Sequence, residues 1–108
     1  MADSRMIMSP GTLQSIASST ITSSYATLGT LAYQARLVKI VNNSTQDVTV
    51  SWNASTNHDY IPAGSFSLYD CTSNAVSNSS FVIPNGTVFS VKGTAGTGNI
   101  YLVYFYAQ

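Results

Sequence analysis

The stretch Val48–Asn53, which reads VTVSWN, decides the fold class. Its apolar residues alternate with polar ones, so an extended chain has one core face and one polar face here, because successive side chains of a β-strand point to opposite sides. A helix would need apolar residues three or four positions apart, and no segment of the chain combines such a stripe with capping residues. This stretch therefore predicts a half-buried β-strand.

Short strands separated by turn residues continue on both sides of this stretch. Turn signals that recur every eight to twelve residues are typical of antiparallel sandwiches and barrels. We predict an all-β chain that forms a single antiparallel β-sandwich, either jelly-roll-like or immunoglobulin-like. The other expected strands are Tyr25–Tyr33 with a kink at Gly29, Arg36–Asn42, His58–Ile61, Ser65–Asp70 with Phe66 and Leu68 on one face, Phe81–Ile83, Thr87–Lys92 and Asn99–Ala107.

The last expected strand, Asn99–Ala107, is apolar at almost every position. A strand that is apolar on both faces is typical of the centre of a sheet, or of a strand packed against a neighbouring chain. The preceding segment, Gly93–Gly98, reads GTAGTG and superficially resembles a phosphate-binding loop. A phosphate-binding loop of that kind opens a helix, whereas a strand follows here, so we interpret this segment as a hairpin connection.

The N-terminal part of the chain differs from the rest in composition. Thr12–Ser24 consists almost entirely of small hydroxyl residues, with single apolar residues at Leu13, Ile16 and Ile21. Such a segment cannot by itself bury enough apolar surface to offset its ordering entropy. We therefore divide the chain into an extended arm, residues 1–24, and a β-sandwich domain, residues 25–108, and expect a neighbouring subunit to hold the arm.

The charge content is very low. Only 7% of the 108 residues are charged, with four Lys or Arg against four Asp and no Glu, so the net charge is zero. Soluble domains are about one quarter charged, and a net charge keeps free monomers dispersed. A neutral surface rich in Ser, Thr and Asn suits a protein that packs against other copies or a larger assembly. The four scattered basic residues provide no electrostatic footprint for nucleic acid.

Targeting signals and disulfides are also not expected. The longest apolar stretch, Ile100–Ala107, is far shorter than the roughly 20 residues of a membrane helix, so we expect no membrane partner. Residues 1–8 contain no uninterrupted apolar segment of the kind found in secretory signals. Cys71 is alone and cannot form an internal disulfide, which fits synthesis in a reducing cytosol.

Few side chains could carry catalysis or bind a metal. The only histidine, His58, lies beside Asp59, and neighbours on a strand point to opposite faces. We interpret this pair as making local turn hydrogen bonds rather than a relay to a serine or to Cys71. Zinc needs three or four His, Cys or carboxylate ligands, and Asp47, Asp59 and Asp70 are too dispersed for a metal or for paired-carboxylate catalysis. We predict no enzyme activity, catalytic residue, cofactor or metal.

Aromatic side chains are the remaining candidates for recognition, because Tyr and Trp are enriched at interfaces. We assign Trp52 and Phe105 to the core, and divide the C-terminal tyrosines between the core rim and an interface. The predicted interface residues are Leu13, Ile16, Ile21, Tyr101, Tyr104 and Tyr106.

Two motifs resemble segments of small virion proteins of tailed bacteriophages. The first joins V-x-V-S-W-N at Val48–Asn53 to H-D-Y-I-P-A-G-x-F-x-L-Y-D at His58–Asp70, and the second is GTAGTGNIY at Gly93–Tyr101. The resemblance covers most of residues 36–106 and leaves the arm outside. It implies a non-enzymatic structural subunit built on a β-sandwich and present in many copies, as capsid decoration, at the head–tail junction or in the tail.

The leading functional hypothesis is a structural virion protein, made in the host cytoplasm, that self-assembles and docks through its arm and aromatic surfaces. Its expected partners are other copies of itself and other virion proteins of the capsid or tail. This hypothesis predicts that a chain lacking residues 1–24 folds but does not assemble. The alternative is a lectin-like adhesion module that binds a host glycan through Trp52, Tyr60, Tyr69 or the loop Cys71–Ser80.

Overall fold

A computed structural model describes residues 8–71 and 82–107. They form nine strands and a single 3-10 turn, η1 (Ser18–Thr20), and these residues contain no α-helix. The strands are β1 (Met8–Pro10), β2 (Gln14–Ala17), β3 (Ala26–Thr30), β4 (Ala35–Ser44), β5 (Val48–Ser51), β6 (Asp59–Ile61), β7 (Phe66–Asp70), β8 (Val88–Gly93) and β9 (Gly98–Ala107).

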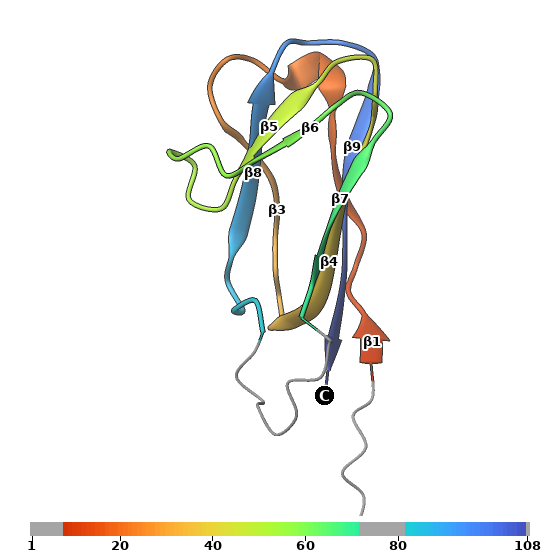
Figure 1. Ribbon diagram of the computed structural model, residues 1–108, viewed down its shortest axis with the longest axis vertical. Coiled ribbons are helices and arrows are strands. Elements are labelled where there is room, and N and C mark those ends of the chain that lie inside the picture. Colours follow the sequence, from red (N-terminus) through yellow and green to blue (C-terminus); the bar gives the residue numbers. More distant parts are fainter. Residues whose placement is uncertain (1–7, 72–81, 108) are drawn as a thin grey trace, which may run out of the picture.

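The strands are arranged in two antiparallel sheets that pack face to face (Figure 1). The first sheet has the order β1-β9-β4-β7, with β2 also paired to β9, and the second has the order β3-β8-β5-β6. The prediction of a single all-β sandwich is confirmed.

The strand pairing is nested. β2 pairs with β9, β3 with β8, β4 with β7 and β5 with β6, all antiparallel, and successive pairs alternate between the two sheets. This is the winding of a jelly roll. The structure thus selects one of the two sandwich topologies that the sequence left open.

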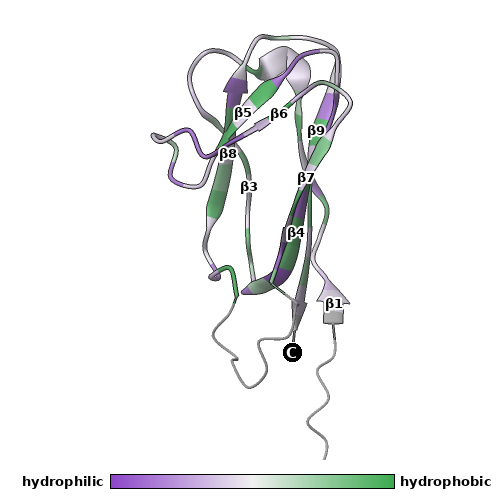
Figure 2. Cartoon of the chain, viewed as in Figure 1, coloured by the Kyte–Doolittle hydropathy of each residue, from purple (hydrophilic) through white to green (hydrophobic). Residues whose placement is uncertain are grey.

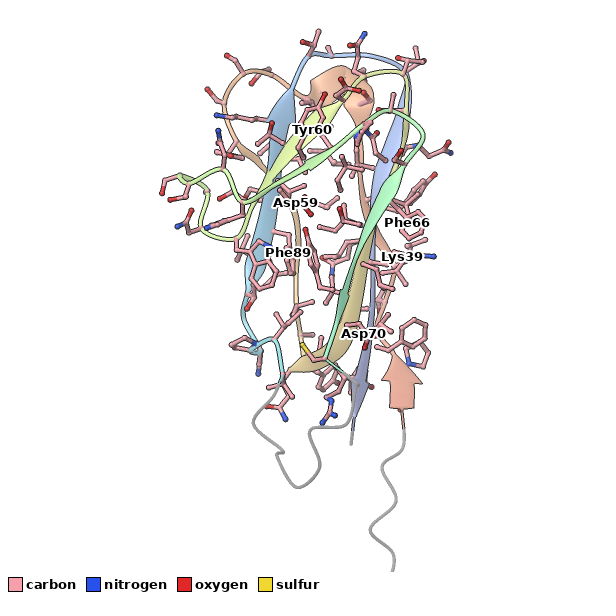
Figure 3. The ribbon with its side chains drawn as sticks, viewed as in Figure 1. Lys39, Asp59, Tyr60, Phe66, Asp70 and Phe89 are labelled. Atoms are coloured by element: carbon pink, nitrogen blue, oxygen red, sulfur yellow. The ribbon has the colours of Figure 1, made fainter. Side chains whose placement is uncertain are left out.

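The core lies between the sheets and consists of every second residue of the facing strands. Val48 and Val50 of β5 are fully buried, as their alternation predicts. Phe89 of β8 is the largest fully buried side chain and lies between the two layers (Figure 3). Hydrophobic residues run along β4, β5 and β8 in Figure 2. The remaining core members are Ile21, Leu28, Leu31, Ala35, Val38, Ile40, Ile61, Ile83, Val91, Ile100, Leu102 and Tyr104.

The strand β9 occupies the centre of the first sheet, with β4 on one side and β1 and β2 on the other. This position explains why its residues are apolar on both faces. The kink expected at Gly29 is also present, because the β3–β8 register shifts between Thr27 and Gly29. A Cβ at Gly29 would lie 2.7 Å from Leu102 of β9, so glycine lets the bulged strand approach the opposite sheet.

The segment before Ser24 is held by its own domain in the described residues. β1 and β2 add to β9 of the same chain, Ile16 packs against the core, and Ile21 is only 1% exposed within it. These contacts, which the sequence assigns to a neighbouring subunit, come from the same chain in the described residues. The edge of β9 opposite β4 pairs with β1 and β2, and a strand edge accepts a polar segment because the hydrogen bonds come from the backbone.

Two predicted features involve residues outside the described part of the chain. Of the loop predicted at Cys71–Ser80, only Cys71 is described. Of the strand predicted at Phe81–Ile83, the first residue is not described. The end of that segment is described, and Ile83 forms an isolated antiparallel bridge with Ala35.

Candidate assembly surface

Nine side chains of β4, β7 and β9 point away from the core and share the outer surface of the first sheet. Val38, Ile40 and Leu102 are fully buried and point into the core. Because side chains alternate along a strand, the residues on either side of them point outward. The register places the nine residues in three rows across the sheet. We call this surface the open face; its rows are Phe105–Leu37–Asp70, Val103–Lys39–Leu68 and Tyr101–Val41–Phe66.

The open face is mainly apolar, since only Lys39 and Asp70 among its nine residues are charged. Phe66 and Leu68 of the edge strand β7 are 59% and 49% exposed. The apolar members on β4 and β9 are half-buried because they are flanked by neighbouring strands. Antiparallel sheets that face water usually alternate core residues with polar ones, so this surface is unusual for a sheet in contact with solvent.

The outer surface of the second sheet follows the usual rule. There Thr49 of β5 lies between Tyr60 of β6 and Lys92 of β8, and Thr27 of β3 lies opposite Ser90, which is only 2% exposed. Each of these side chains carries a polar group. The two outer surfaces of the sandwich therefore differ in character, and only the first presents contiguous hydrocarbon.

The two charges of the open face have opposite sign. Lys39 is in the middle row, and its Nζ lies 5.6 Å from the centre of the Phe66 ring, a cation–π contact. Asp70 is at a corner, opposite Leu37. Lys39, Phe66 and Asp70 all lie on the side of the first sheet away from Phe89 and the core (Figure 3). The face as a whole is electrically balanced.

The predicted interface residues are divided between surface and core. Tyr101 belongs to the open face, and Leu13 is 58% exposed. Tyr104 is only 2% exposed and its Oη accepts a hydrogen bond of 3.2 Å from the Ala32 N–H, so it is a core residue like Ile21. Phe105, assigned to the core, lies on the open face, because β9 alternates and Tyr104 takes the inward position.

Tyr106 is part of an aromatic cluster at the end of the first sheet. Its ring stacks on Tyr33, with centroids 4.2 Å apart, and Tyr33 is 52% exposed. Beside the cluster is a hollow of about 590 Å³, lined mainly by the N-terminal segment and by Tyr33, Tyr104 and Tyr106. The Gln14 side chain lines this hollow. Its amide nitrogen donates to the Thr30 carbonyl and its amide oxygen accepts from the Thr30 N–H, so both polar atoms of the amide already have partners within the fold.

The aromatics of the glycan-binding hypothesis are mostly engaged within the fold. The Trp52 ring packs edge-on against Tyr69 and Phe89, at centroid distances of 5.2 and 5.1 Å. Tyr60 is 57% exposed and donates a hydrogen bond from its Oη to Asp47. It borders a second hollow of about 490 Å³ lined by Thr49, Asn57, His58, Asp59 and Tyr60. Among the three aromatic residues Trp52, Tyr60 and Tyr69, Tyr60 therefore has the most exposed ring.

Two carboxylates near this hollow are held in their charged form. Partial burial raises the pKa of Asp59, but hydrogen bonds from Tyr69, Ser67 and the Tyr60 N–H outweigh it and leave that pKa below its usual value. The hydrogen bond from Tyr60, followed by one from the Ala63 N–H, lowers the pKa of Asp47. Burial, together with the hydrogen bond to Asp59, raises the pKa of Tyr69.

His58 and Cys71 are the described side chains that could serve as a base and a thiol nucleophile. The Nδ1 of His58 accepts a hydrogen bond of 3.0 Å from the Trp52 N–H, which is the local turn contact that the sequence predicts. Burial raises the pKa of the Cys71 thiol and disfavours its thiolate. Among residues 8–71 and 82–107, no three His, Cys, Asp or Glu side chains gather as metal ligands. Nor does any helix within these ranges have the length and apolar character to cross a bilayer.

Of the nine open-face residues, sequence reasoning named only Tyr101 as an interface residue, and the most exposed of the residues that it missed are Phe66 and Leu68. Their shared face was recognisable from the alternation of residues 66–70, but the pattern does not say which face of a strand meets the core.

Comparisons of the chain with protein-family models, with curated proteins and with solved structures found no match.

Proposed function

We propose that this chain is a structural virion protein of a tailed bacteriophage, which self-associates and docks onto the capsid or onto a head–tail or tail assembly. The observation that carries this proposal is the open face, an apolar sheet surface on a domain with no net charge. Contiguous exposed apolar surface marks interaction sites. The lack of net charge removes the repulsion that would keep copies apart.

The fold itself does not choose between the leading function and its alternative, because jelly rolls occur in both viral capsid proteins and lectins. The character of the surface favours assembly. A sugar site needs convergent polar groups that hydrogen-bond hydroxyls, whereas seven of the nine positions of the open face are apolar or aromatic. The motifs at Val48–Asp70 and Gly93–Tyr101 support the virion setting.

The virion setting is tested by co-sedimentation. In a phage lysate that contains this protein, it should band with intact particles in a density gradient and stay with them after a second gradient. A protein that remains entirely in the soluble fractions, while particles lack it, would contradict the proposal.

A second candidate function is glycan binding at the hollow beside Tyr60. The observation that favours it is an exposed tyrosine ring next to Asn57, His58 and Asp59, which together offer a stacking surface and polar groups. The test is a glycan array with the full-length protein and the variant Tyr60→Ala. Binding that the variant loses would support this function, and an array with no signal would exclude the glycans it carries.

A further inference from the structure

We propose that the open face binds the same face of a second copy of this chain, so that two sandwiches pack sheet against sheet. The inference rests on the self-association in the proposed function and assigns a surface and a geometry to it. Because the same patch is used by both copies, the contact is isologous and closes into a dimer with two-fold symmetry.

The size of the open face fits the core of such an interface. With strands about 4.8 Å apart and a rise of about 3.4 Å per residue, three rows on three strands cover roughly 15 by 20 Å in plan. A specific interface of standard size takes about 800 Å² of accessible surface from each partner, and its outer part is a polar rim. The open face is large enough for the apolar centre, and Ser15 of β2, opposite Tyr101, is placed to contribute to the rim.

The chemistry of the face matches a second copy better than a charged partner. Each copy brings one ammonium group, from Lys39, and one carboxylate, from Asp70, so two copies together bury no excess of either sign. The remaining positions mix large side chains with the smaller Val41 and Val103. Sheets that pack face to face interdigitate in this way about 10 Å apart, as the two sheets do inside each sandwich.

Pairing of β7 edges between two copies is the main alternative geometry. It would use the outer edge of β7, which ends the first sheet among the described residues, and extend that sheet. However, it would leave the apolar side chains of β4 and β9 in water, among them Leu37, Tyr101 and Phe105. Only face-to-face packing covers all three strands.

The test measures the mass of the full-length protein by light scattering from about 5 to about 500 μM, a range that spans weak interfaces. Two variants alter the open face: Phe66→Lys with Leu68→Lys on β7, and Tyr101→Lys on β9. The matched control is Tyr60→Lys, because Tyr60 is 57% exposed, close to the 59% of Phe66, but lies on the second sheet. Circular dichroism and thermal melting verify that each variant is folded.

We expect the wild-type mass to approach twice the 11.5 kDa of one chain. Both open-face variants should raise the dimer dissociation constant at least tenfold, and the control should leave it unchanged. An oligomer that survives both variants would overturn this inference while leaving self-association in place through another surface. Loss of the dimer with the β7 variant alone would indicate edge pairing and also overturn it. A wild-type monomer throughout would overturn the dimer, and co-sedimentation with phage particles would then decide the virion setting separately.

Discussion

At the scale of single residues, Asn42 is the polar group on which one end of the sandwich depends. It is completely buried, and its side-chain nitrogen donates to the carbonyls of Gln46, at 2.9 Å, and Ile61, at 3.0 Å. Its Oδ1 accepts from Ser44 Oγ at 2.5 Å. A buried amide in which every polar atom is paired fixes the backbone around it. Asn42 thus joins β4 to the following turn and to β6.

We predict that Asn42→Ala lowers the free energy of unfolding by about 1–3 kcal/mol, because the Ile61 carbonyl loses the Asn42 amide as a donor in a buried site, while the Gln46 carbonyl keeps the Ser44 hydroxyl as a donor at 3.0 Å. Urea denaturation monitored by circular dichroism measures the loss. The control is Asn43→Ala at the next, exposed position, which should change stability much less. Equal effects of the two substitutions would show that the buried network is not stabilising.

A second residue-scale prediction concerns acid stability. The folded-state pKa of Asp59 lies below its unfolded value, so the folded protein binds fewer protons and its stability falls as pH falls through the folded pKa. We expect the free energy of unfolding to decrease between about pH 5 and pH 2, with part of this slope due to Asp59. The variant Asp59→Asn keeps an acceptor for the Tyr69 hydroxyl, 2.5 Å away, and should flatten the slope.

Tyr69→Phe provides the complementary measurement. It removes the hydroxyl that stabilises the Asp59 carboxylate, so it should also flatten the acid dependence while lowering stability near neutral pH. If neither variant alters the slope of stability against pH, the hydrogen bonds at Asp59 do not contribute to acid denaturation.

At the scale of elements, β9 organises the first sheet because strands from both ends of the chain meet on it. β4 pairs with one edge from Ala35 to Ser44, and the N-terminal strands β1 and β2 pair with the other. Deleting residues 1–24 would therefore remove two strands and the buried Ile21 together. Such a truncation tests folding as much as assembly, so point substitutions are the better probe of this segment.

We predict a graded response to alanine along the N-terminal segment. Ile21→Ala should cost about 2–5 kcal/mol, as expected for a large side chain removed from a packed core. Ile16→Ala should cost less, since Ile16 is partly buried, and Leu13→Ala should have little effect on folding because Leu13 is 58% exposed. Chemical denaturation at two protein concentrations provides the measurement. A cost of Ile21→Ala that depends on concentration would mean that another copy holds the segment.

At the scale of the whole molecule, the two outer surfaces of the sandwich explain the composition. The outer surface of the second sheet presents Thr49, Tyr60 and Lys92, whereas the open face of the first sheet presents the large apolar side chains of Phe66 and Leu68. With a net charge of zero, solubility depends on these hydroxyl surfaces. The hydrophobic contribution to association is then concentrated on one side, which favours a closed contact over indefinite aggregation.

This arrangement predicts a concentration-dependent melting temperature. A folded dimer is stabilised by mass action, so the melting temperature of the wild-type protein should rise with protein concentration. Differential scanning calorimetry at several concentrations measures the rise. The double variant Phe66→Lys, Leu68→Lys should melt at a temperature that does not change with concentration. A wild-type melting temperature that is equally independent of concentration would contradict a dimer formed by folded copies.

The sequence by itself determined the local features of this protein. Alternation at Val48–Asn53 predicted a strand, which the structure has at Val48–Ser51, although Ser51, expected on the polar face, is fully buried. The kink predicted at Gly29 and the central strand predicted at Asn99–Ala107 are both present. These features depend on side-chain direction and backbone freedom within a few residues, which the sequence shows directly. The role of Tyr101 as an interface residue stays a prediction, and the register places its side chain on the open face.

Only the tertiary structure decided which strands pair and which of their faces meet water. The nested jelly-roll pairing joins segments far apart in the chain, from β2 and β9 at the outside to β5 and β6 at the centre. Period-two alternation at Phe66–Asp70 is the same for an inward and an outward Phe66, so the exposure of Phe66 and Leu68 follows from the register with β4. The place of Ile21 in the core likewise depends on the pairing of the preceding strand β2 with β9, a backbone feature that no side-chain pattern records.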